Sequence, residues 1–115
     1  MKKHLLLFLT LILTSVSYAH AQTKVDKYCQ VTIGTNNVNR KKVAKISFGE
    51  NKGKFALKDS IIIKQLYQVN DLATGTDILN YMAQIGWNLV SIHSSSPWYE
   101  VFYFKRTFDS SELTP

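Results

Sequence analysis

Apolar residues recur at three- and four-residue spacing in residues 76–86, and this pattern predicts a helix with one buried side. The recurring positions are Ile78, Leu79, Met82, Ala83 and Ile85. Thr76 or Asp77 is expected to cap the first turn, because a side-chain oxygen there accepts an otherwise unpaired backbone N–H. Gly86 is expected to end the helix, since glycine adopts the left-handed conformation readily, and Trp87 then folds back onto the last turn.

Two hydrophobic runs, residues 87–93 and 99–108, follow this helix and predict a β-hairpin. In the register we expect, His93 faces Tyr99 and both faces of the hairpin are apolar. One face carries Trp87, Leu89, Val101 and Tyr103, and the other carries Val90, Ile92, Phe102 and Phe104. A sheet with one solvated side would alternate apolar and polar residues instead. We therefore expect the face that the helix leaves open to be covered by residues 58–69, by curvature of the sheet, or by another copy of the chain.

Three shorter runs of strand-forming residues precede the helix, at residues 28–33, 43–48 and 54–57, and predict an antiparallel meander. The next segment is ambiguous, because its three consecutive isoleucines favour a strand whereas Ile62, Leu66 and Val69 lie at helical spacing. We expect extended structure in residues 61–69. The predicted fold class is α+β, an antiparallel sheet of about four to five strands with one principal helix on one face, in the order β-β-β-α-β-β.

The N-terminus has the three parts of a secretory signal peptide. Lys2 and Lys3 form a basic start, residues 5–16 form an apolar run, and residues 19–21 read Ala-His-Ala, a small-residue cleavage site. The apolar run is too short to span a bilayer. We expect cleavage near Ala21, a single domain over residues 22–115, no transmembrane segment after cleavage, and a periplasmic or extracellular location.

Three short motifs resemble a family of small exported bacterial proteins of unknown function. They are Asn-Tyr-Met at residues 80–82, Gly-Trp followed by Leu-Val-Ser within residues 86–91, and Phe-Lys-Arg at residues 104–106. A cytoplasmic domain family of unknown function is similar, with "GWELVS" and "LKR" elements. The resemblance implies a fold for residues 76–108. It implies no activity, substrate or catalytic residue.

Cys29 is the only cysteine, so an intramolecular disulfide is excluded. It alternates with Val31 and Ile33 along a strand-like run. Because cysteine is among the residues most often buried, we expect an unpaired thiol inside the sheet.

The basic residues are unevenly distributed, since residues 40–64 contain eight Lys and Arg and two acids. This stretch could meet a polyanion such as anionic lipid headgroups or polysaccharide. The candidate anion contacts are Arg40, Lys41, Lys42 and Lys45. The interpretation we favour is different: lysines on an exposed strand edge discourage pairing with other chains. Export argues against nucleic acid as a partner.

Candidate catalytic residues are few. His4 and His20 belong to the signal, which leaves His93 beside Ser94 and two further serines. No complete set of nucleophile, base and orienting group is recognisable. One cysteine and one distant histidine do not make a zinc site, and there is no glycine-rich phosphate loop. We expect no metal and no cofactor, and an enzyme is the weaker interpretation.

The leading hypothesis is an exported, non-enzymatic binding or structural module that acts through an apolar sheet face, with a protein partner or a second copy of the chain. The alternatives are a small hydrolase-like enzyme near His93 and an anionic lipid or polysaccharide binder that uses residues 40–64.

Overall fold

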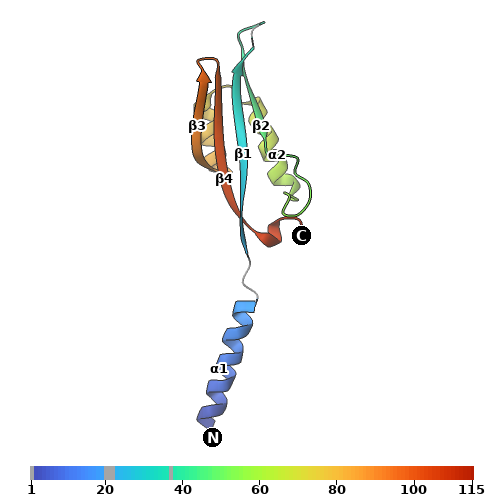
Figure 1. Ribbon diagram of the computed structural model, residues 1–115, viewed down its shortest axis with the longest axis vertical. Coiled ribbons are helices and arrows are strands. Elements are labelled where there is room, and N and C mark those ends of the chain that lie inside the picture. The colour runs from blue at the N-terminus through green and yellow to red at the C-terminus, as the bar shows by residue number, and fades with distance from the viewer. Residues whose placement is uncertain (1, 20–22, 37) are drawn as a thin grey trace.

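The computed structural model describes residues 2–19, 23–36 and 38–115. Its elements follow in the order α1 (Lys2–Ala19), β1 (Lys24–Thr35), β2 (Lys42–Ser47), α2 (Ser60–Gln68), the 3-10 turn η1 (Val69–Asp71), α3 (Gly75–Gln84), β3 (Asn88–Ser96), β4 (Tyr99–Asp109) and the 3-10 turn η2 (Ser110–Glu112) (Figure 1).

The four strands form one antiparallel sheet in the order β2-β1-β4-β3. Its centre is the β1–β4 pair, which extends from Lys24 opposite Asp109 to Gly34 opposite Tyr99. Both strands are rich in β-branched and aromatic residues, which suit a pleated, half-buried surface. The prediction of an α+β fold with an antiparallel sheet is confirmed.

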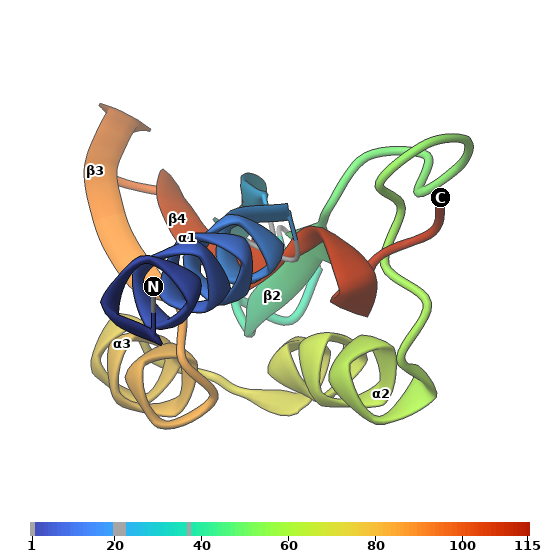
Figure 2. The same ribbon diagram turned by 90° about the horizontal axis from the view of Figure 1, so that it is seen from below.

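Helices α2 and α3 lie side by side on one face of this sheet (Figure 2). Alternate residues of each strand point towards them, because successive side chains of a strand lie on opposite faces. The core between the two layers contains Cys29, Val31, Ile33, Ala44, Ile46, Phe102, Phe104 and Phe108 from the strands, and Leu66, Val69, Ile78 and Met82 from the helices and η1.

The register of the β3–β4 hairpin differs from the expected one. His93 lies opposite Val101 rather than Tyr99, and the turn is tighter, with Ser96 opposite Tyr99. The register also shifts between Leu89 and Ser91 and between Ser94 and Ser96. Each such bulge inserts one extra residue and changes which face the following side chains occupy.

These bulges alter the composition of the two faces. Leu89 and Ile92 pair with phenylalanines and so lie on the helix-covered side, whereas Tyr103 pairs with Ser91 on the open side. Tyr28 and Tyr99 are also exposed on the open side, among Gln30, Thr32 and Lys45. The open face is therefore mixed, and the expectation that both faces of the hairpin are apolar is wrong.

Residues 60–68 form helix α2 and not the extended segment that their isoleucines favoured. Asp59 caps the helix, because its Oδ1 accepts the Ile61 N–H at 2.9 Å. Leu66 and Val69 are fully buried against the sheet, so the helical spacing of the apolar residues outweighs their β propensity. The sheet domain thus contains two helices where one principal helix was expected.

The expected strand at residues 54–57 does not form; it is reduced to an isolated bridge between Leu57 and Leu113. The Asn51 side chain fixes the loop of residues 51–57 through two hydrogen bonds to Leu57. Its Oδ1 accepts the Leu57 N–H at 2.7 Å, and its Nδ2 donates to the Leu57 carbonyl at 3.2 Å. The C-terminal Thr114 accepts the Phe55 N–H on its carbonyl at 2.8 Å. The element order is therefore β-β-α-α-β-β after α1, and not β-β-β-α-β-β.

The N-cap of helix α3 lies two residues before Thr76, the first of the two expected caps. Thr74 is the N-cap, with its Oγ1 accepting the Asp77 N–H at 3.1 Å. The predicted end is confirmed. Gly86 has φ of +88°, its N–H donates to Ala83, and the Trp87 N–H donates to the Met82 carbonyl at 2.8 Å. This pair of bonds is a Schellman motif, which satisfies carbonyls that the helix end leaves free.

Helix α1 covers most of the expected signal peptide. The cleavage site at residues 19–21 lies mainly outside the described residues, which omit residues 20–22. In the portion of the chain that the structure describes, no helix is both long and apolar enough to span a membrane.

Replacing Trp87 with alanine is expected to destabilise the fold by about 3–5 kcal/mol, because it removes a large side chain that is only 1% exposed and leaves a cavity. Gly86→Ala should cost about 1 kcal/mol through its positive φ. The two losses should not add, since both act on one helix end. Urea melts of the two single variants and the double variant measure this.

Trp98→Ala is the control, because Trp98 is 69% exposed and its truncation should be nearly neutral. A near-neutral Trp87→Ala would contradict the role assigned to this indole.

Candidate functional site

The β1–β2 loop and the β3–β4 turn meet at one end of the sheet. The Thr35 N–H donates to the Trp98 carbonyl at 3.2 Å and joins the two connections. Asparagines shape the β1–β2 loop: Asn36 Oδ1 accepts the Val38 N–H at 2.9 Å, and Asn39 Oδ1 accepts the Lys41 N–H at 3.0 Å. Such side-chain bonds to nearby amides fix turns locally.

A cavity of about 550 Å³ lies between these connections, and we call it the end cavity. It is lined by Thr35, Asn36, Arg40, Lys42 and Trp98. A second hollow of about 270 Å³ shares Thr35, Lys42 and Trp98 with the end cavity and extends to residues 74–76 at the start of α3. Glu100 lines this second hollow but not the end cavity.

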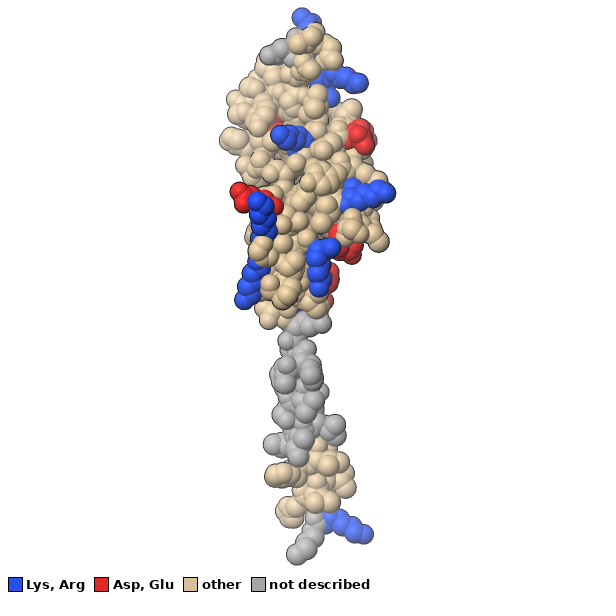
Figure 3. All heavy atoms as spheres, turned by 90° about the vertical axis from the view of Figure 1, so that its right-hand side faces the viewer, with Lys and Arg blue, Asp and Glu red and all other residues tan. Residues whose placement is uncertain are grey.

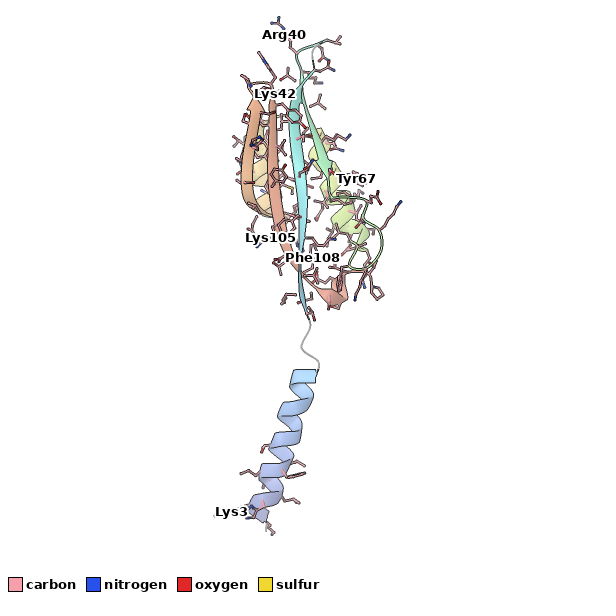
Figure 4. All side chains as sticks on the ribbon, in the orientation of Figure 1. Lys3, Arg40, Lys42, Tyr67, Lys105 and Phe108 are labelled. Carbon is pink, nitrogen blue, oxygen red and sulfur yellow. The ribbon has the colours of Figure 1, made fainter. Side chains whose placement is uncertain are left out.

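Two cations and one indole line the end cavity. The ion pairs of the described residues are Lys24–Asp109 and Lys105–Asp26, so neither Arg40 nor Lys42 is neutralised by one. Both lie at the loop end of the sheet (Figure 4). Trp98 is 69% exposed, which is unusual for so large an apolar surface. The lining therefore offers positive charge and an aromatic face to the same volume.

The backbone at Arg40 is strained. Its φ is +54°, in the left-handed region that non-glycine residues rarely adopt. The loop holds it there, because the Asn36 N–H donates to the Lys41 carbonyl at 2.8 Å and closes the connection around it. Strain of this kind persists only where the surroundings impose it, and it clusters at binding sites.

The structure separates the four candidate anion contacts. Arg40 and Lys42 line the end cavity, whereas Lys41 and Lys45 do not. Lys45 lies in β2 opposite Thr32, on the open face of the sheet. Seen from the β2 and α2 side, the basic side chains are dispersed and interspersed with acids and do not form one continuous patch (Figure 3).

Trp98 is the lining residue that sequence reasoning did not single out. In the sequence it falls between residues 87–93 and 99–108, the two runs that predict the hairpin. The signal was an aromatic residue directly after a proline in a polar turn, where no core position is expected. Its relation to Arg40 and Lys42 depends on the pairing of β1 with β4, which is not visible locally.

The arrangement around His93 does not form a nucleophilic site. His93 is exposed on the open face of β3, opposite Val101. The Ser94 hydroxyl donates to the Ser96 carbonyl at 3.3 Å, and the Ser96 hydroxyl accepts the Trp98 N–H at 3.3 Å. Both hydroxyls therefore serve the turn. Among the described residues, no three His, Cys, Asp or Glu side chains are grouped as metal ligands would be.

Cys29 is buried and unpaired, as predicted. It lies opposite Phe104 on the helix-covered side of the sheet. Burial raises the pKa of its thiol to about 12, because the low-dielectric core disfavours the thiolate. A thiol in this state is a packing residue and not a nucleophile.

Comparisons of the chain with protein-family models, with curated proteins and with solved structures find no match. The resemblance to the exported family stays a prediction.

The Cys29 thiol is expected to resist a thiol-reactive dye in the native protein at pH 8, since a pKa of about 12 leaves about one thiol in ten thousand ionised. Denaturant should release it for complete labelling. Val43→Cys is the control, because position 43 is half-exposed on β2 and should add one rapidly labelled thiol. Rapid labelling of the unmodified native chain would show that the strand opens or that the thiol is accessible.

Proposed function

We propose that this chain is an exported, non-enzymatic binding module whose ligand is an anionic polysaccharide. The observation that carries the proposal is the lining of the end cavity, to which Arg40, Lys42 and the exposed Trp98 all contribute. Sulfate, phosphate or carboxylate groups of such a polymer would be attracted by the two cations. The indole supplies an apolar face on which a sugar ring can pack.

The shape of the site favours a polysaccharide over a membrane surface. A membrane binder needs a broad basic or apolar face, since each cation near an anionic leaflet contributes only about 1 kcal/mol. Here the basic side chains on the β2 and α2 side are dispersed (Figure 3). Arg40 and Lys42 instead border one hollow, the end cavity. A volume of about 550 Å³ is within the range of small-ligand pockets and suits one or two sugar units of a longer chain.

The apolar sheet face of the leading sequence hypothesis receives less support. The open face carries tyrosines among Gln30, Thr32 and Lys45, which is a wet surface and not a contiguous apolar patch. The same face holds His93, whose serine neighbours are engaged in the turn.

The double variant Arg40→Gln/Lys42→Gln is expected to elute from heparin at clearly lower salt than the parent, because two charges that border the ligand are lost. Lys52→Gln/Lys64→Gln is the matched control, since it removes the same charge from exposed positions outside the end cavity. The control should elute nearly as the parent does.

A second measurement separates site binding from net charge. Trp98 is the exposed tryptophan of the sheet domain and Trp87 the buried one, so acrylamide quenches chiefly Trp98. A sulfated oligosaccharide should protect Trp98 from quenching, and Trp98→Phe should remove that response. Equal loss of retention in both charge variants, or no protection of Trp98, would contradict the proposal. Binding to anionic vesicles without binding to the oligosaccharide would assign the cations to a lipid surface instead.

Export is tested separately. Mass spectrometry of the natively expressed protein should find an N-terminus near Gln22, because residues 19–21 have the small residues that signal peptidase requires. Ala19→Leu/Ala21→Leu should retain the leader. Recovery of the intact Met1 form from the cytoplasm would contradict this part of the proposal.

A further inference from the structure

The two edges of the sheet are protected to different degrees. On the β2 edge, Lys42 and Lys45 are exposed, and charged residues hinder pairing with another strand. The turn η1 also packs beside β2, where Asn70 Oδ1 accepts the Ile46 N–H at 2.9 Å. A side chain of the same molecule therefore occupies one of the backbone donors that a new strand would need.

The β3 edge has neither protection. Asn88–Ser96 contains no charged residue and no proline over its nine residues. β3 pairs with β4 alone, and no hydrogen bond in the described part of the chain links its outer backbone groups to another element. Leu89, Val90 and Ile92 are 44%, 55% and 49% exposed. A nine-residue edge strand without charge and with three exposed apolar residues is a template for pairing with a further strand.

The bulge in β3 places two of these residues on one face. Leu89 pairs with Phe104 and Ile92 with Phe102, so both lie on the helix-covered side although they are three residues apart. In a regular strand, residues three apart point to opposite faces. The extra residue at the bulge is Val90, between the pairs formed by Leu89 and Ser91. The edge therefore presents an apolar pair on one side of the sheet, spaced about a point between Val90 and Ser91.

We propose that β3 pairs in antiparallel fashion with β3 of a second copy of this chain, about a two-fold axis between Val90 and Ser91. This axis sets Leu89 opposite the second copy's Ile92, and Ile92 opposite the second copy's Leu89. The contact is isologous, because the same surface is used twice. The two sheets become one continuous sheet, with all four helices of the two domains on the same side.

Charge favours a second copy over an unrelated strand. The basic residues of positions 40–64 belong to the β1–β2 loop, β2, the loop that follows it and α2, and none of these segments pairs with β3, so two copies that pair through β3 keep these charges off the shared edge. An acidic partner segment would be drawn to the basic side and would find no complementary charge on β3. A neutral strand with matched apolar residues is supplied by β3 itself.

The experiment is sedimentation of the protein as cells produce it from the full-length sequence, over about a hundredfold range of concentration. A reversible dimer is expected. Val90→Lys should shift the protein to monomer at every concentration, because it places a charge on the edge that must pair. Val43→Lys is the matched control, since Val43 is 51% exposed on β2, at the opposite edge, and this variant should dimerise as the parent does.

Hydrogen exchange keeps the test independent of variant folding. Amides of β3 should become protected as the concentration of the unmodified protein rises, whereas those of β2 should not change. A protein that stays monomeric with unprotected β3 amides would overturn the proposal. A dimer that survives Val90→Lys with native circular dichroism, or β3 protection that arises only with a different protein bound, would also overturn it.

Discussion

The junction between the end of α3 and the central strand β4 is the constraint on which the remaining structure depends. The Schellman motif at Gly86 turns the chain. Trp87 is then buried edge-on against Phe108, with 6.0 Å between the two ring centres. Arg106 completes the junction: its Nη1 donates to the Ile85 carbonyl at 2.9 Å, and its guanidinium lies 4.7 Å from the Phe108 ring centre. A cation at a helix C-terminus also opposes the helix dipole. The direction in which β3 leaves α3, and hence the whole hairpin, follows from these contacts.

This junction also explains which parts of the fold could be predicted. The helix end, the following strands and the burial of Cys29 could be predicted because each depends on neighbouring residues. A glycine marks the helix end, and alternation of apolar and polar residues marks the strands and the buried position of Cys29. The Gly-Trp and Lys-Arg motifs that carried the resemblance meet in space at Gly86 and Arg106, so they have a structural role whatever the protein binds. By contrast, the three consecutive isoleucines of α2 favour a strand. The helix forms because Asp59 caps its first turn and because a helix buries Leu66 against the sheet.

The candidate site was harder to predict than the fold, because it is assembled from segments far apart in the sequence. Alternation along β2 directs Lys45 to the open face, and the turn of the β1–β2 loop separates Lys41 from Arg40 and Lys42. Trp98 joins them only through the β1–β4 pairing and the Thr35–Trp98 hydrogen bond. The bulges of β3 were equally invisible, since a bulge depends on how two strands pair and not on the residues of one. They decide both the composition of the open face and the placement of Leu89 beside Ile92.

The proposed polysaccharide site and the proposed β3 pairing have a joint geometric consequence. The end cavity lies at the turn between β3 and β4, about six residues from the axis between Val90 and Ser91, which is about 20 Å along a strand. A two-fold axis perpendicular to the sheet therefore puts the two end cavities at opposite ends, about 40 Å apart along the strand direction. A short oligosaccharide cannot reach both sites, whereas a long polymer can bind twice, and the second binding step is then intramolecular. For the dimer, affinity should rise steeply once the polymer is long enough to reach both end cavities. For a monomer, affinity should rise only in proportion to the number of binding positions along the polymer. Under the two proposals, the dependence of affinity on polymer length is therefore set by the β3 edge, although no residue of that edge lines the end cavity.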